Sequence, residues 1–113
     1  MYNQGQALQI LSEVHKACQP IFNNKLKDIY LYGSYARGDY HEESDVDILI
    51  VLDLEPSEIS EYRQPVAAIA SDLSLKHDIT VSVTMKPAIQ IRKYMNIVPF
   101  YKNVLEEGIR YGT

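Results

Sequence analysis

The chain has 113 residues, which is enough for one small domain and too few for two, and 46% of them are hydrophobic, which is enough to build a core. Its formal net charge is −4, so it lacks the excess of Lys and Arg with which proteins contact nucleic-acid phosphates. We therefore predict a single domain over residues 1–113 and do not expect a nucleic-acid partner.

Secretion and membrane insertion are also disfavoured. No stretch approaches the roughly 20 apolar residues that span a bilayer, and the N-terminus has neither a basic region nor a long apolar run. The single cysteine, Cys18, rules out an intramolecular disulfide, and its apolar helical setting predicts a buried thiol in a reducing compartment. We expect a cytoplasmic protein without a membrane partner.

The first half of the chain predicts a helix and two strands. Apolar residues at helical spacing indicate a helix from about Gln4, which Pro20 should end or kink. A β-branched and aromatic run over residues 29–32 predicts a strand, and a continuous apolar run over residues 48–52 predicts a buried one. A small polar turn therefore lies between two strands.

The second half predicts three further helical regions and one strand. Ser57 is the expected N-cap of a helix that Pro65 interrupts, with Pro65 opening a second segment. Alternating apolar and hydroxyl residues over 78–84 predict a strand, and helices should occupy 87–96 and 99–107. The expected class is α/β (α+β), a small mixed sheet flanked by helices.

The polar turn between the first two strands is a candidate phosphate-binding element. Gly33 allows the backbone to bend and a ligand to come close. Ser34 is a good N-cap for a short helical turn that Gly38 would end. Free amides at the start of such a turn attract phosphate.

Two carboxylates stand at the head of the second predicted strand. Side chains two residues apart on a strand point to the same face, so Asp45 and Asp47 should lie together while Val46 points into the core. Paired hard oxygen ligands suit Mg²⁺, which binds a few carboxylates together with phosphate oxygens. The sequence therefore predicts a magnesium site beside the phosphate-binding turn.

Two short motifs carry a resemblance to a known family. They are Gly33-Ser34-x-x-Arg37-Gly38 and Ser44-Asp45-x-Asp47. Together they resemble the signature of the DNA polymerase β-type nucleotidyltransferase superfamily, in its minimal nucleotidyltransferase branch. The resemblance runs from about Ile10 to about Val83, and residues 99–109 are similar to the ending of bacterial members. It implies a polymerase β-like nucleotidyltransferase fold.

The resemblance also implies a set of site residues. Two Mg²⁺ ions would be held by Asp45, Asp47 and a third carboxylate on a later strand, for which Asp78 at the head of the 78–84 strand is the match. The nucleotide, expected to be ATP, would be held by Gly33, Ser34, Arg37 and Ser44. Arg37 would either brace the turn or reach the phosphates, and Asp78 is also the candidate to take the acceptor's proton. His41 and His77 are expected to be incidental.

The resemblance implies a partner as well. Minimal members are typically paired with a helical HEPN-domain toxin, and some transfer AMP from ATP to a tyrosine of that toxin, so this chain would be the antitoxin. Two alternatives stay open: a non-catalytic module that occludes its partner, and a nucleotidyltransferase acting on a small molecule such as an aminoglycoside. Three converging carboxylates argue against a pure binder, because like charges are costly to gather. Whether the chain self-associates is left open.

Overall fold

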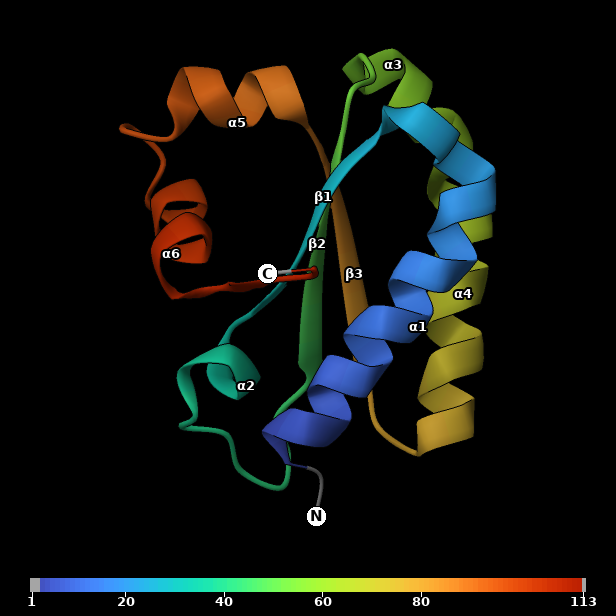
Figure 1. Ribbon diagram of the computed structural model, residues 1–113, viewed down its shortest axis with the longest axis vertical. Helices are drawn as coiled ribbons and strands as arrows, with labels where there is room; N and C mark the ends of the chain where they lie inside the picture. The colour runs from blue at the N-terminus through green and yellow to red at the C-terminus, as the bar shows by residue number, and fades with distance from the viewer. Residues whose placement is uncertain (1–2, 113) are drawn as a thin grey trace.

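Four strands form one mixed sheet in the computed structural model, which describes residues 3–112 (Figure 1). The strands are β1 (Leu26–Tyr32), β2 (Val46–Leu52), β3 (Val81–Pro87) and β4 (Ile109–Arg110), in the spatial order β3-β2-β1-β4. β1 pairs antiparallel with β2 and β4, whereas β2 pairs parallel with β3. The predicted α/β class with a small mixed sheet is confirmed.

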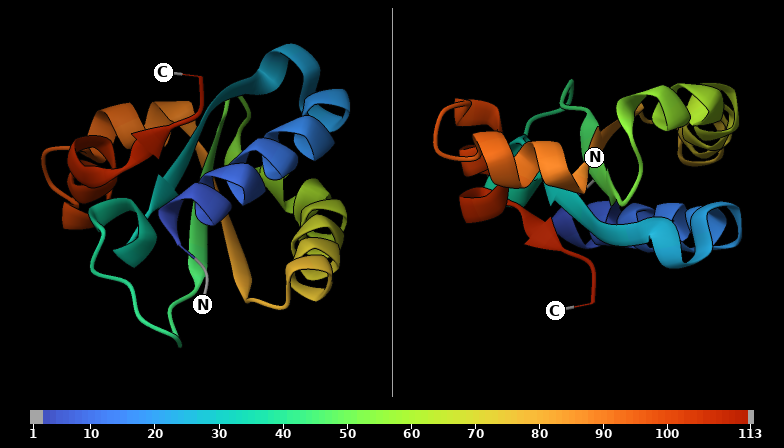
Figure 2. Two further views of the ribbon diagram at one scale, coloured as in Figure 1. Left: turned by 60° about the horizontal axis from the view of Figure 1, so that its bottom comes forward. Right: turned by 90° about the horizontal axis from the view of Figure 1, so that it is seen from above.

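Helices cover both faces of this sheet. Helices α1 (Gln4–Phe22) and α4 (Arg63–His77) pack on one face, and α5 (Ala88–Tyr94) and α6 (Pro99–Glu107) lie on the other (Figures 1 and 2). The single turn α2 (Ser34–Arg37) joins β1 to β2, and α3 (Pro56–Ile59) follows β2. Among residues 3–112, no helix is long and apolar enough to cross a membrane.

The alternation of side chains along β2 explains why both faces can be covered. Val46, Ile48 and Ile50 belong to the core beneath α1 and α4, and each is fully buried. Leu49 and Val51 belong to a second, smaller core beneath α5 and α6. Because successive side chains point to opposite faces, a continuous apolar run supplies both cores.

Pro20 does not end the first helix, and the predicted N-cap Ser57 is wrong. α1 continues through Pro20 to Phe22, because a proline near the end of a helix removes only one backbone hydrogen bond. The N-cap of α3 is Glu55 and not Ser57, with Pro56 in the first helical position. The amide of Glu55 donates to Glu58 Oε1 at 2.9 Å, so a capping box begins the helix earlier than expected.

The third strand also begins later than predicted. α4 runs to His77, and Asp78 ends it in the left-handed conformation, with φ 52° and ψ 45°. Strand β3 starts at Val81, so Asp78 is a helix C-cap and not a strand residue. Aspartate is one of the few non-glycine residues that tolerate this conformation.

The C-terminal elements are closer to expectation. α6 spans the predicted residues 99–107, whereas α5 stops at Tyr94, earlier than the predicted 87–96, with Pro87 as its N-cap. The short strand β4 was not predicted. It pairs with Tyr30 and Leu31 of β1, and Arg110 Nη1 lies 3.3 Å from Asp28 Oδ1.

Candidate active site

The predicted turn and carboxylates meet at one end of the sheet, where β1 ends and β2 and β3 begin, in the lower part of Figure 1. β1 leads directly into Gly33, and the chain then makes α2 before returning to the sheet at β2. Because β1 and β2 are antiparallel neighbours, the end of one lies beside the start of the other. Tyr32 is the register partner of Asp47.

Gly33 packs against the Asp47 carboxylate. Its backbone has φ +76°, which L side chains rarely adopt, and a Cβ at this position would lie 2.5 Å from Asp47 Oδ2. A side chain would therefore collide with the carboxylate as well as strain the backbone. The backbone conformation favours glycine at this position, and the close approach to Asp47 makes the turn and the carboxylate parts of one site.

Contacts from α1 and from the following loop fix the turn. The carbonyl of Gly33 accepts hydrogen bonds at 3.1 Å from the amides of Ala36 and Arg37. Gln4 Nε2 donates to the carbonyl of Tyr35 at 2.9 Å, which ties the start of α1 to the turn. The buried Tyr35 ring stacks on Tyr40 at 4.5 Å. Contacts with α1 and with the loop after the turn therefore hold α2 in place.

Asp45 and Asp47 form an unequal pair of carboxylates. Asp45 is exposed, and Asp47 is partly buried. The pKa of Asp47 is raised, first because burial disfavours its charged form and then because the charge of Asp45 repels it, while Arg37 acts in the opposite direction. A divalent cation would relieve this repulsion, so the donor chemistry of these two residues fits Mg²⁺.

Asp78 does not join them. It is exposed at the end of α4, and among residues 3–112 no group of three or more His, Cys, Asp and Glu side chains could hold a metal ion. The parallel register instead places Ser82 of β3 directly beside Asp47. The three-carboxylate set implied by the resemblance is therefore not assembled.

Arg37 and Ser44 make contacts within the protein. Arg37 Nε donates to Asp39 Oδ2 at 3.2 Å, and its Nη1 lies 3.6 Å from Glu107 Oε2 of α6. Both carboxylates raise the pKa of Arg37, Asp39 the more strongly. The Ser44 hydroxyl accepts from the amide of His41 at 2.9 Å and closes its own loop. These contacts link Arg37 to its own loop and to α6.

The two histidines near the motifs also have local partners. His41 Nδ1 accepts from the amide of Glu43 at 3.1 Å. His77 Nε2 lies 2.5 Å from Glu13 Oε2 on α1, and Lys76 pairs with the same carboxylate. These contacts explain both residues without a catalytic role.

Tyr32 and helix α6 are neighbours of the site that the motifs did not reveal. The Tyr32 ring meets Phe100 edge-on at 5.3 Å, and the pKa of Tyr32 is raised, first by burial and also by Asp47, against a hydrogen bond to Thr84. A cavity of about 220 Å³ adjoins the turn at this point. Its lining residues are Tyr32, Gly33, Arg37, Phe100, Asn103, Val104 and Glu107. The sequence pattern could not place Tyr32 beside Asp47, because that also requires the register between β1 and β2.

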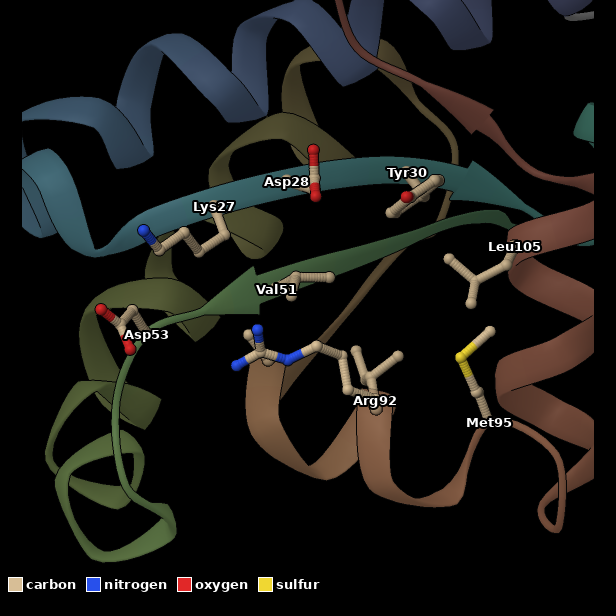
Figure 3. Close-up of a pocket in the computed structure, with 10 residues that line it drawn as sticks. Lys27, Asp28, Tyr30, Val51, Asp53, Arg92, Met95 and Leu105 are labelled. Carbon is tan, nitrogen blue, oxygen red and sulfur yellow. The ribbon is translucent and has the colours of Figure 1, made fainter.

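A larger cavity, of about 340 Å³, lies on the same face of the sheet but toward its other end (Figure 3). It lies between the strands and helices α5 and α6, and its lining includes Tyr30, Val51, Arg92 and Met95. None of the predicted site residues lines it. Val51 is about 13 Å from Asp47 along the strand, so we place the site at the Gly33 turn and not in this cavity.

Comparison with known proteins agrees with the fold and the motifs. Residues 11–111 match the family described as "Nucleotidyltransferase domain". A provisionally named protein adenylyltransferase of Methanocaldococcus jannaschii is 44% identical over 77 residues, covering 68% of this chain and 76% of the relative. A second protein of that organism with the same provisional name is 38% identical over 98 residues, covering 87% of this chain and 90% of the relative.

Solved structures show the same fold. A structure provisionally described as a nucleotidyltransferase of Sulfolobus solfataricus has a TM-score of 0.62 at 21% identity, covering 96% of this chain and 81% of that one. A toxin-antitoxin structure with AMP-PNP has a TM-score of 0.53 at 22% identity, covering 99% of this chain and 75% of that one. With the family match over most of its length, the chain belongs to the nucleotidyltransferase domain family.

Proposed function

We propose that this chain is a Mg²⁺-dependent protein adenylyltransferase that moves AMP from ATP to a tyrosine hydroxyl of a helical HEPN-type toxin in the cytoplasm, and so acts as its antitoxin. The observation that carries the proposal is the contact between Gly33 and Asp47, which joins a turn suited to phosphate and a carboxylate suited to a cation in one site. Either element alone has many uses, but together they suit a metal-bound triphosphate.

Each residue then has a task. The turn at Gly33 and Ser34 binds the β- and γ-phosphates, because the start of a helical turn attracts phosphate. Asp45 and Asp47 would hold the cation, which would supply positive charge to neutralise the phosphates. Arg37 keeps the turn in place through Asp39 and Glu107.

The reaction balances without another reagent. The acceptor oxygen forms a bond to the α-phosphorus of ATP, the bond from that phosphorus to the bridging oxygen breaks, and pyrophosphate leaves. The hydroxyl proton passes to solvent or to a nearby base. Because the two reacting groups must be held in line, most of the catalytic work is positioning and charge neutralisation.

The choice of acceptor rests on the relatives. The two M. jannaschii proteins carry the provisional name protein adenylyltransferase, and a protein of Thermococcus cleftensis named protein adenylyltransferase MntA is 36% identical over 59 residues. The exposed position of Asp45 is consistent with an acceptor presented by another protein. These names support a protein acceptor over a small molecule such as an aminoglycoside.

The test is transfer of label from ATP radiolabelled on its α-phosphate. The chain is co-expressed with a helical HEPN-type protein as the proposed partner, and transfer with Mg²⁺ is compared between the wild type and Asp45→Asn/Asp47→Asn. We expect the wild type to label a tyrosine of the partner. The double variant should leave the partner unlabelled. If neither protein labels the partner yet both bind and silence it, the chain is an occluding module and the catalytic proposal is wrong.

A further inference from the structure

A row of three side chains crosses the sheet at the candidate site. Asp47 on β2 has Tyr32 as its register partner on β1 and Ser82 as its partner on β3. Register partners on neighbouring strands point to the same face of a sheet. Ser82 is therefore the β3 residue that flanks Asp47 on the face where Asp47 contacts the Gly33 turn.

The neighbouring residues of β3 confirm which face this is. Val81 and Val83 pack in the core beneath α1 and α4, on the opposite face. Thr84, two residues further along β3, shares the face of Ser82. The face of β3 that meets the site thus carries hydroxyl side chains in place of carboxylates.

Asp78 is not a strand residue, so the pairing of β3 with β2 does not place it beside Asp47. It caps α4 before the strand begins, and the first contact between the two parallel strands is the hydrogen bond from the Val46 amide to the Thr80 carbonyl, at 2.9 Å. A carboxylate reaching the cation from β3 would have to stand at Ser82.

We infer that Ser82 is the cation-site residue of β3, and that the site offers two carboxylates and one hydroxyl to a single tightly held divalent cation. The inference rests on the proposed function, because it concerns the cation of that site. Two carboxylates balance the charge of one divalent ion, so a second ion would depend on the phosphates of the nucleotide for its counter-charge. The acceptor proton then has no third carboxylate of this chain to receive it.

The test is Mn²⁺ binding to the full chain without nucleotide, measured by electron paramagnetic resonance. We expect one tight Mn²⁺ per chain in the wild type, lost in Asp47→Asn and unchanged in Asp78→Asn. Ser82→Asp should bind Mn²⁺ about tenfold more tightly, or bind a second ion, because affinity follows the number of charged ligands. The uncharged variant of matched size, Ser82→Asn, should show no gain. Circular dichroism of each variant shows whether it is folded.

The outcomes separate the inference from the function on which it rests. If Asp78→Asn loses Mn²⁺ as Asp47→Asn does, or if folded Ser82→Asp binds no better than Ser82→Asn, then Ser82 does not face the cation and the inference is wrong. If wild-type binding is absent or does not depend on Asp47, the proposed cation site itself is wrong. If the wild type and Asp78→Asn both transfer AMP, the result supports the inference about Ser82 and the proposed function.

Discussion

The two faces of the sheet are built differently. Beneath α1 and α4, strand β2 presents Val46, Ile48, Ile50 and Leu52, all fully buried, to an apolar core. On the other face the same strand presents Asp47 before Leu49 and Val51, and β3 presents Ser82 and Thr84. The first face holds the larger core, and the second holds the polar groups of the candidate site.

This difference shows how a small domain separates stability from chemistry. Adjacent residues of a strand face opposite sides, so a catalytic carboxylate can stand next to a core residue without entering the core. Asp47 and Ile48 are neighbours in the chain but belong to different faces. Substitutions at the two positions should therefore fail in different ways.

The largest effect should come from Asp47→Asn. Loss of the carboxylate removes a ligand of the proposed cation site, so we expect AMP transfer to fall by roughly 10³-fold, about 4 kcal/mol of transition-state stabilisation, in a protein that still folds. The measurement is the rate of label transfer. Asp53→Asn, an exposed carboxylate just beyond the other end of β2, is the matched control and should retain full activity. Equal losses in the two variants would contradict the placement of the site at the Gly33 end of β2.

Ile48→Ala should have the opposite profile. Ile48 is 0% exposed in the larger core, and truncating such a side chain costs about 2–5 kcal/mol through lost burial and the cavity left behind. Urea denaturation should show the lower midpoint, while the folded fraction keeps its transfer rate. Lys86→Ala, on the other face of β3, should change the free energy of unfolding by less than about 0.5 kcal/mol. A larger effect at Lys86 than at Ile48 would reverse the assignment of the faces.

Gly33→Ala and Gly38→Ala test the contact that joins the turn to Asp47. Both glycines have positive φ, but a Cβ on Gly38 would meet no atom within 4 Å, whereas one on Gly33 would meet Asp47. We expect Gly38→Ala to lose about 1 kcal/mol from backbone strain alone, and Gly33→Ala to lose about 2–3 kcal/mol. Thermal denaturation gives the stabilities, and Mn²⁺ binding should weaken only in Gly33→Ala. Equal behaviour of the two variants would mean that the contact has no role.

The smallest effects should be opposite pH dependences of two carboxyl groups. The pKa of Asp47 is raised above its ordinary 3.8, chiefly by burial, so its contribution to stability falls as the pH rises through the folded-state pKa. The pKa of Glu13, beside Lys76 and His77, is lowered from 4.5, so its contribution is present above pH 4.5 and is lost as the pH falls through the folded-state pKa.

Without divalent cations at pH 7, Asp47→Asn should therefore raise the melting temperature by a few degrees, and Glu13→Gln should lower it by a similar amount. At a pH below both folded-state pKa values, where both carboxyl groups are protonated, each difference should disappear. Calorimetry across this pH range measures both. A melting temperature that falls in Asp47→Asn at pH 7 would show that the carboxylate stabilises the fold.

Local patterns predicted the elements that flank the site but not the end of α4. The helix continues to His77 because Lys76 and His77 both contact Glu13 of α1, a residue far away in the sequence. Asp78, predicted at the head of a strand, is therefore the C-cap of α4. The two-residue strand β4 was missed for a similar reason, since it exists only by pairing with β1.

The sequence by itself determined the turn, the paired aspartates and their common face, because glycine backbone freedom and the period of two along a strand are local properties. Only the tertiary structure decided which residue of β3 stands beside Asp47. The register between two strands depends on how their core side chains pack, and here Val46 beside Val81 places Ser82 at that position. The two motifs therefore supply most residues of the candidate site, and the pairing of β2 with β3 places Ser82 beside them.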